Sequence, residues 1–333
     1  MAAISASKQL IILSLPDDPY YRKSVSHIED FVREMGEKTN GLDDLLVLYP
    51  RSFDKQNKKS SKPLFNDKML RIAVDESLDL WIRDYGLVPS PQEPVKFTYK
   101  PNYLKSKDAK YIDLEFSKFI GNLDVSVTKS DIVLDGGNVV DNNRNKAIIS
   151  ERVLADNKSK SKSDLKNELE NLLHSKVAFI PDPEDTTGHS DGIVSFIEHD
   201  VLLIGDYNDS EYYNAVEKAI KSEFPDLETV RLPCPAGVPR GASGSGKEKG
   251  FTTAVGSYVN ALVTNRAVYV PQFGNASCDA KALEIIKGLT SKTVVGVDTS
   301  KLSHMGGSVR CMSWQIESSH FVAQALYKCC TAK

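Results

Sequence analysis

Short apolar runs alternate with amphipathic stretches along most of the chain, in the order strand, polar loop, helix, strand. The first such unit runs from a strand at residues 8–15, through a helix at 20–38, to a strand at 45–48. The same unit recurs in residues 147–180, 201–232 and 267–297. Its strands are short and rich in Val and Ile, which is typical of buried strands.

The spacing of apolar residues supports the predicted helices. Ala280, Leu283, Ile286 and Leu289 recur every three residues and form one apolar face. Residues 71–134 would hold a fifth unit, in which the helix is less clear. Repeated α/β units must be closed or capped to hide their sheet edges, so one domain of about five units arranged in a ring is a reasonable architecture. An open doubly wound sheet is the alternative.

Composition narrows the function classes. The chain has 333 residues, of which 41% are hydrophobic and 26% charged, as in an ordinary soluble globular protein. The formal net charge of −3 gives no polybasic footprint for nucleic acid or an anionic membrane. No run of about twenty apolar residues is present, so we expect no membrane span.

Cysteine usage argues against a disulfide framework. The five cysteines form no CxxC pair, so neither a disulfide scaffold nor a zinc site is expected. A reducing compartment, and hence the cytoplasm, is the expected location. We also expect no cofactor and no metal.

Four stretches place unusual polar residues in loops just after apolar runs. These stretches are residues 81–86, 133–138, 181–192 and 305–314. If the units close in a ring, such loops converge at one end of it. That arrangement would gather Asp84, His189, Asp191 and Cys311 in one pocket.

This set of side chains points to a cationic substrate. Two carboxylates beside a thiol disfavour the thiolate, unless the ligand brings positive charge. A guanidinium does so, and its planar fork matches carboxylates bidentately. Its central carbon would lie next to the sulfur of Cys311, and His189 could protonate the departing amine and later activate water. The expected reaction forms a covalent thiol adduct and releases ammonia.

Taken together, the motifs resemble the agmatine deiminase and bacterial-type peptidylarginine deiminase family, which has the guanidine-modifying pentein fold. The matching stretches, in the family's order, are Trp-Ile-Arg-Asp-Tyr-Gly (81–86), Leu-Asp-Gly-Gly-Asn (134–138), Gly-His-Ser-Asp-Gly (188–192), Ser-Tyr-Val-Asn (257–260), Val-Pro-Gln-Phe-Gly (270–274) and Gly-Gly-Ser-Val-Arg-Cys (306–311). Each motif is weak alone, but six in order span nearly the whole chain. The resemblance implies a single α/β catalytic domain over residues 1–333, a five-bladed propeller of ββαβ-like units with pseudo-fivefold symmetry.

The resemblance also implies residue roles. Cys311 would be the nucleophile and His189 the general acid and base, while Asp84 and Asp191 would bind the guanidinium and Asn260 would line the site. Three further residues are candidate substrate contacts: Trp81, Arg83 and Asp135. Each has a structural alternative, since Trp81 could be core, Asp135 could only open a turn, and Asp84 could pair with Arg83 or Arg71 on the surface.

Two of the motifs depart from the family pattern. Asp135 stands where many agmatine deiminases carry Glu, and Arg310 precedes the nucleophile where His is usual. Agmatine is the expected substrate. Free arginine or an arginyl peptide is the alternative, with a substrate carboxylate held by Lys96, Lys100 or Lys105. A protein that binds a guanidine without turning it over is a third alternative.

The Gly- and Pro-rich stretch at residues 233–250 is expected to be a long loop, and a lid over the pocket is one role for it. Within it, residues 241–247 nearly fit a phosphate-binding loop, but Glu248 cannot supply the hydroxyl that would bind Mg²⁺. The expected partner is therefore a small guanidine or an arginyl peptide, and a homo-oligomer stays open.

Overall fold

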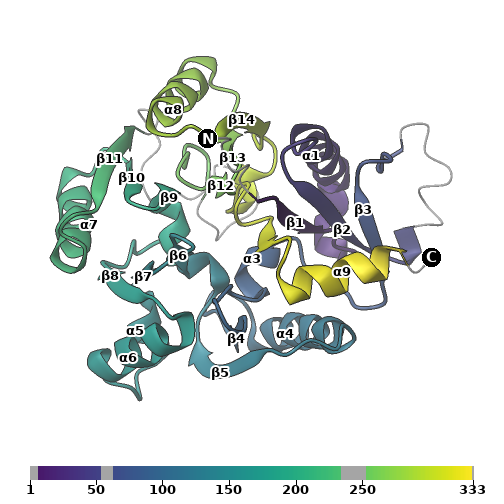
Figure 1. Cartoon of the computed structure of the whole chain (residues 1–333), viewed down its shortest axis with the longest axis horizontal. Coiled ribbons are helices and arrows are strands. Elements are labelled where there is room, and N and C mark those ends of the chain that lie inside the picture. Colours follow the sequence, from purple (N-terminus) through teal and green to yellow (C-terminus); the bar gives the residue numbers. More distant parts are fainter. Residues whose placement is uncertain (1–6, 54–62, 234–252, 332–333) are drawn as a thin grey trace, which may run out of the picture.

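Five small sheets form a ring around a central axis (Figure 1). The computed structural model describes residues 7–53, 63–233 and 253–331. Each sheet is built on two parallel strands, and a helix connects the two. The predicted ring of repeated units is therefore confirmed, and the alternative of one open doubly wound sheet is wrong.

The first blade unites segments from opposite ends of the chain. Its sheet has the strand order β15-β1-β2-β3. Its elements are β1 (Gln9–Ser14), η1 (Pro19–Lys23), α1 (Val25–Lys38), β2 (Asp44–Pro50), β3 (Leu70–Val74), β15 (Trp314–Glu317) and α9 (Phe321–Thr331). Because β3 pairs in parallel with β2, the start of segment 71–134 belongs to this blade and not to the fifth unit.

The other four blades follow in chain order. The second has β4 (Val95–Thr98), α4 (Ser106–Gly121) and β5 (Thr128–Val133). The third has β6 (Val140–Asp141), β7 (Lys146–Ser150), α5 (Arg152–Asp156), α6 (Lys162–Leu173) and β8 (Lys176–Ile180). The fourth has β9 (Val194–Glu198), β10 (Val201–Asp206), α7 (Ser210–Glu223) and β11 (Glu228–Pro233). The fifth has β12 (Leu262–Val263), β13 (Ala267–Gln272), α8 (Ala276–Leu289) and β14 (Thr293–Asp298).

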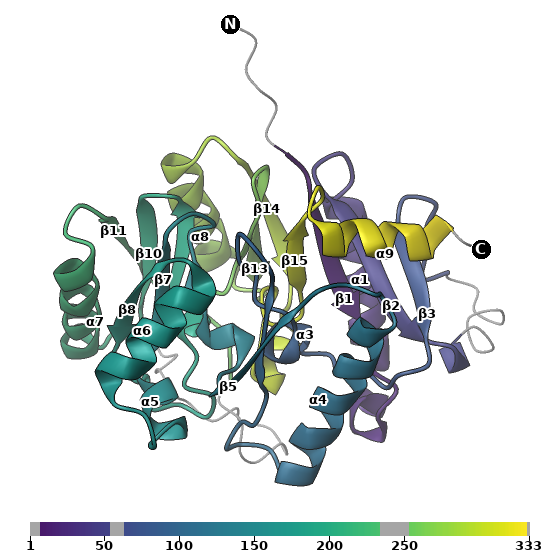
Figure 2. The same cartoon turned by 60° about the horizontal axis from the view of Figure 1, so that its bottom comes forward.

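The helices lie on the outside of the ring, and Figure 2 shows α4 and α6 in front of the strands that they cover. The apolar face of α1 buries Ile28, Phe31, Val32 and Met35, which is the spacing expected of an amphipathic helix. Several helices contact the neighbouring blade as well, since α1 meets β14 and α7 meets β8. The blades are thereby joined by side-chain packing between helices and strands.

Helix starts differ from the prediction because of their caps. Residues 20–23 lie in the separate 3-10 turn η1, which begins at Pro19 and precedes α1, and the Asp18 side chain accepts from Tyr20 N. In α6 the N-cap is Ser161, whose hydroxyl accepts a hydrogen bond from Asp164 N at 3.1 Å.

The helix of the second blade, α4, is regular although its sequence pattern is blurred. It buries Ala109, Phe116 and Phe119 on one face. Tyr111 and Leu114 are apolar but exposed on the other face, at 52% and 49% of their area. Two apolar residues on the solvent side weaken the contrast on which the prediction of a helix depends.

An inner strand lies antiparallel to the first strand of the parallel pair in four blades. These inner strands are β15, β6, β9 and β12. In the second blade, a single antiparallel bridge between Val88 and Val95 takes the same place. All the inner strands thus run in one direction along the ring axis, so the segments that precede them lie at one end.

Two further observations concern the predictions for loops and membranes. None of the helices in the described ranges combines the length and the apolarity that crossing a bilayer requires. The near-match to a phosphate-binding loop at 241–247 and nearly all of the proposed lid at 233–250 lie outside the described residues.

Trp314 at the start of β15 provides a test of how the ring is closed. It is 1% exposed and packs edge-on against Phe116 of α4, with ring centroids 5.8 Å apart. We expect Trp314→Ala to lower the free energy of unfolding by about 3–5 kcal/mol, because a large cavity would remain. Urea unfolding followed by far-UV circular dichroism measures this loss. Phe321→Ala is the control, because Phe321 is 39% exposed, and an equal loss in both variants would contradict this account.

Candidate functional site

Five short segments, one before each inner strand, meet at one end of the ring. We call them the entry loops: residues 81–86, 135–138, 188–192, 257–260 and 306–312. They include the short helical turns α3 (Ile82–Tyr85), η2 (Gly136–Asn138) and η3 (Ser190–Gly192). A further turn, η4 (Ser303–Met305), leads into the last of them. The convergence predicted from the repeat is confirmed.

Hydrogen bonds join the entry loops to one another. Arg83 N donates to Cys311 O at 3.2 Å, and Arg310 N donates to Asn260 O at 3.3 Å. The Asn260 amide donates to Asp191 O at 3.2 Å. Ser190 N in turn donates to the Asn138 side chain at 3.1 Å. Because these bonds use main-chain atoms, the relative positions of the loops are fixed by the backbone.

The thiol of Cys311 lies between an amide and a carboxylate. Its Sγ is 3.2 Å from Nδ2 of Asn260 and 3.9 Å from Oδ2 of Asp191. The side chain of Cys311 is buried, and so are those of Asn260 and Asp191. The structure thus brings the side chains of Cys311, Asn260 and Asp191 together.

His189 lies between two carboxylates. Its Nε2 is 3.1 Å from Oδ2 of Asp135, and its Nδ1 is 3.7 Å from Oδ1 of Asp84. Tyr103 donates its hydroxyl to the same Asp135 oxygen at 2.9 Å. Asp135 therefore fixes the orientation of the imidazole, and this contact goes beyond the turn-opening role considered from the sequence.

Asp84 is buried and does not form the surface ion pair considered as an alternative. Its Oδ1 has no hydrogen-bond partner within the described part of the chain. Arg71, one of the two cations considered for that pair, instead lies over the ring of Phe65. A buried carboxylate oxygen without a donor is costly, so this atom is available for a ligand that donates hydrogen bonds.

Electrostatics in this cluster work against the thiolate. Burial raises the pKa of the Cys311 thiol well above its ordinary value, and the charges of Asp191 and Asp84 raise it further. Burial also raises the pKa of Asp84 to about 7, although nearby His189 opposes the shift. Burial alone would lower the pKa of His189, but Asp84, Asp135 and Asp191 raise it to about 10. Added positive charge would therefore stabilise both the thiolate and the Asp84 carboxylate.

Two arginines lie beside the cluster, and the sequence did not reveal how they are arranged. Arg310 pairs with Asp191, with Nη1 2.8 Å from Oδ2, and donates to Val139 O at 2.7 Å. Arg83 directs its guanidinium away from Asp84, toward Gln315 Oε1 at 3.3 Å. Arg83 was predicted to contact the substrate, but its side chain lines a different cavity.

Trp81 and Tyr103 complete the surroundings of the site. Trp81 packs against the apolar core as a partly buried residue, and a Cβ at Gly307 would lie 2.3 Å from its ring. Gly307 is therefore required for the loop before Cys311 to pass the indole. Tyr103 was missed because a lone tyrosine in a Lys-rich segment carries no signal of its own. In the described ranges, no three His, Cys, Asp or Glu side chains are grouped so as to bind a metal ion.

Comparison with known proteins agrees with this geometry. Residues 1–316 match the Porphyromonas-type peptidyl-arginine deiminase family. The chain belongs to this family. The resemblance drawn from the six motifs is thereby confirmed.

Individual relatives of the deiminase family are distant in sequence. The agmatine deiminase of Medicago truncatula is 26% identical over 299 residues, which is 74% of this chain and 78% of the relative. A relative from Lactococcus lactis is 28% identical over 215 residues, but the match spans only 57% of this chain and 58% of the relative.

Solved structures establish the fold. The agmatine deiminase of C. jejuni has a TM-score of 0.75 at 20% identity, and 94% of each chain is covered. That of Enterococcus faecalis has a TM-score of 0.75 at 19% identity, again with 94% of each chain covered. A DDAH from Pseudomonas aeruginosa is more distant, with a TM-score of 0.56 at 14% identity over 93% of this chain and all of the other. The predicted α/β pentein fold is confirmed.

A substitution at Gly137 tests how closely the side chains of His189 and Asp84 pack against the backbone of this glycine. A Cβ at Gly137 would lie 2.5 Å from His189 Nδ1 and 2.6 Å from Asp84 Oδ1. We expect Gly137→Ala to destabilise the fold by about 1–3 kcal/mol, because both side chains are buried and must shift. Urea unfolding measures the loss. Gly192→Ala is the control, since nothing lies within 4 Å of the position that a Cβ would take there, and an unchanged stability of Gly137→Ala would contradict the close approach.

The raised pKa of Cys311 predicts a slow thiol in the free protein. We expect alkylation by neutral iodoacetamide to be slow at pH 8 and to accelerate as the pH rises beyond 9, because only the thiolate reacts. Asp191→Asn should speed the reaction severalfold at a given pH, because it removes a negative charge that raises the thiol pKa. Peptide mapping by mass spectrometry separates Cys311 from the other cysteines of the chain, of which Cys278, Cys329 and Cys330 are free thiols in the described residues.

The control for this experiment is Asp200→Asn, since the Asp200 side chain is exposed. It should leave the alkylation rate of Cys311 unchanged. A wild-type thiol that reacts at pH 7 as fast as free cysteine would contradict the electrostatic account.

Proposed function

We propose that this protein is a hydrolase that deiminates agmatine to N-carbamoylputrescine and ammonia. The observation that carries the proposal is the arrangement of acidic groups around one buried thiol. Asp84 keeps an oxygen without a donor, and Asp191 lies 3.9 Å from the sulfur of Cys311. A guanidinium between them would supply hydrogen-bond donors and the missing positive charge.

In the proposed reaction, the bound cation lowers the thiol pKa, and Cys311 releases its proton to water. The sulfur then attacks the guanidinium carbon and forms a C–S bond. His189, which is protonated at neutral pH because its pKa is raised to about 10, donates its proton to one amino group, and that group leaves as ammonia. A thiouronium remains on Cys311.

In the second half of the reaction, His189 acts as a base and Cys311 is the leaving group. Neutral His189 takes a proton from water, and the resulting hydroxide attacks the thiouronium carbon. The C–S bond breaks, Cys311 leaves as a thiolate, and the urea product passes its extra proton to the released ammonia. Asp135 and Tyr103 orient the imidazole through both steps, as their hydrogen bonds favour, and Asn260 holds the sulfur.

Agmatine is favoured over arginine by what surrounds the site. A substrate carboxylate needs a cation, and Lys96 is already paired with Asp113 and bonded to Phe97 O at 3.0 Å. Arg310 is paired with Asp191. The Medicago truncatula relative is named an agmatine deiminase. Trp81 would form part of the pocket wall against the substrate's carbon chain.

Peptidyl-arginine or free arginine is the second candidate, because the matching family is named for peptidyl-arginine. Lys100 and Lys105 are exposed in the segment that carries Tyr103, and either would be the carboxylate partner. If arginine were preferred, Lys100→Ala or Lys105→Ala should lower kcat/KM for arginine and leave agmatine unaffected.

The proposed location is the cytoplasm, because a free thiol nucleophile favours a reducing compartment.

Ammonia release from agmatine, arginine and an arginyl peptide tests the proposal directly. We expect turnover of agmatine, and we expect Cys311→Ala to abolish it by at least about a thousandfold while agmatine still binds in calorimetry. Cys278→Ala is the control, because it removes another free thiol.

Three outcomes would decide between the alternatives. Full activity of Cys311→Ala would overturn the mechanism. Folded wild-type protein that is silent on all three compounds would overturn the hydrolase assignment. Tight agmatine binding without ammonia release would instead support a guanidine-binding protein.

A further inference from the structure

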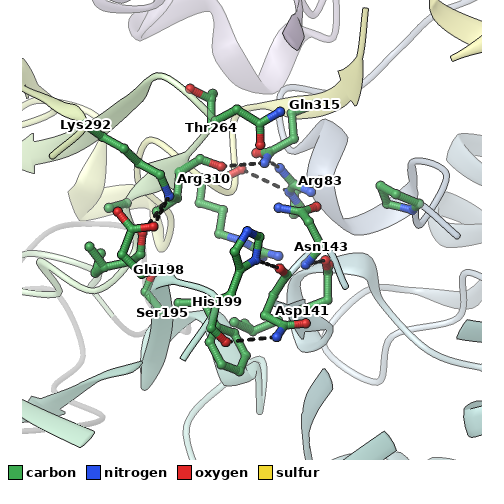
Figure 3. Close-up of a pocket in the computed structure, with 18 of the residues that line it drawn as sticks. Arg83, Asp141, Asn143, Ser195, Glu198, His199, Thr264, Lys292, Arg310 and Gln315 are labelled. Carbon is green, nitrogen blue, oxygen red and sulfur yellow. Dashed lines mark hydrogen bonds and ion pairs between the residues drawn. The ribbon is translucent and has the colours of Figure 1, made fainter. Parts of the chain in front are cut away.

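A cavity of about 320 Å³, which we call the axial cavity, lies on the ring axis beyond the entry loops (Figure 3). Its walls come from residues further along the inner strands, such as Ser195 and Glu198 of β9 and Gln315 of β15. Because the entry loops precede these strands, the axial cavity opens at the other end of the strands from Cys311. Arg83 and Arg310 form the boundary between the two ends.

The cations of the axial cavity are not equally neutralised. Arg310 is paired with Asp191 at 2.8 Å, and Lys292 has Glu198 at 3.5 Å. Arg83 has only neutral acceptors: Gln315 Oε1 at 3.3 Å and Arg310 O at 3.4 Å. No carboxylate of the described residues lies within ion-pair distance of it, and its Nη1 has no partner among them.

Arg83 is nevertheless deeply buried, with 7% of its area exposed. Burial and the adjacent charge of Arg310 together lower the pKa of its guanidinium to about 9. A buried cation beside another cation is costly unless an anion compensates it. The charges of Asp191 and Asp141 compensate Arg83 in part, but Asp191 is paired with Arg310, and Asp141 Oδ1 accepts a hydrogen bond from Asn143 N.

We propose that the axial cavity is a binding site for a small oxyanion, a carboxylate or a phosphate, held by the guanidinium of Arg83. The planar fork of arginine suits either group, since both accept two parallel hydrogen bonds. The cavity is polar and large enough for such a group with a short chain attached.

Occupancy of this site is coupled to the thiol. Arg83 N donates to Cys311 O at 3.2 Å, and the thiolate of Cys311 would itself stabilise the charge of Arg83. The positive charge of Arg83 would stabilise both a bound anion and the Cys311 thiolate, and the two negative charges repel each other. Anion binding and thiolate formation therefore oppose each other. The anion should therefore slow alkylation of Cys311. The binding itself does not depend on the proposed catalytic activity.

Calorimetric titration of the full chain with inorganic phosphate, and separately with acetate, tests the site at low ionic strength. We expect saturable binding of at least one of them, and the tighter one identifies the preferred group. Arg83→Gln should weaken binding at least tenfold. Asp141→Asn should tighten it severalfold, because it removes the opposing negative charge without altering the shape of the cavity.

The outcomes are separable from those of the deimination assay. Absence of binding to wild-type protein, or unchanged binding in both variants, would overturn the proposal. If Arg83→Gln fails to fold, as judged by circular dichroism, Asp141→Asn alone decides, because unchanged affinity in that variant would refute a site at Arg83. Iodoacetamide labelling of Cys311 with and without phosphate then measures the coupling, and an unchanged rate would refute it.

Discussion

The whole arrangement depends on holding like charges together in a buried space. Asp191 and Asp84 bring negative charge to a thiol whose reactive form is also negative, and Asp135 adds a third carboxylate beside His189. His189 and Arg310 offset only part of that charge. Such a cluster would relax apart in a flexible chain. Here main-chain hydrogen bonds between the entry loops keep it in place, and each loop is anchored by an inner strand. The ring architecture thus supplies the rigidity that the electrostatics oppose.

Much of this could be predicted from the sequence, because its causes are local. The strands of the parallel pairs are short apolar runs, and their helices carry an apolar face, so period and order predict the repeated units. The repeat alone left open whether these units form a ring or an open sheet, and the six family motifs favoured the ring. Helix starts were less accurate because several residues near each start are plausible caps. Ser161 and Ser163 differ only in whether the hydroxyl reaches a free N–H, which depends on the path of the preceding chain.

The sequence predicted which residues form the site, but not the directions in which their side chains point. The motifs identify Asp84, His189, Asp191 and Cys311, and the structure brings all of them together. Neighbours in a helical turn point in directions about 100° apart, so Arg83 and Asp84 face different ends of the axis although they are adjacent in the motif. Tyr103, in the loop between β4 and α4, reaches Asp135. This contact depends on tertiary packing, which the sequence pattern does not reveal.

One more consequence follows from the first blade, where β15 is antiparallel to β1. During synthesis, the residue with the reactive sulfur leaves the ribosome after the other four entry loops, directly ahead of the strand that completes the first sheet. Cys311 and the strand that completes the first sheet are therefore synthesised almost at the same time. A chain interrupted before Cys311 therefore lacks both the nucleophile and the strand that completes the first sheet.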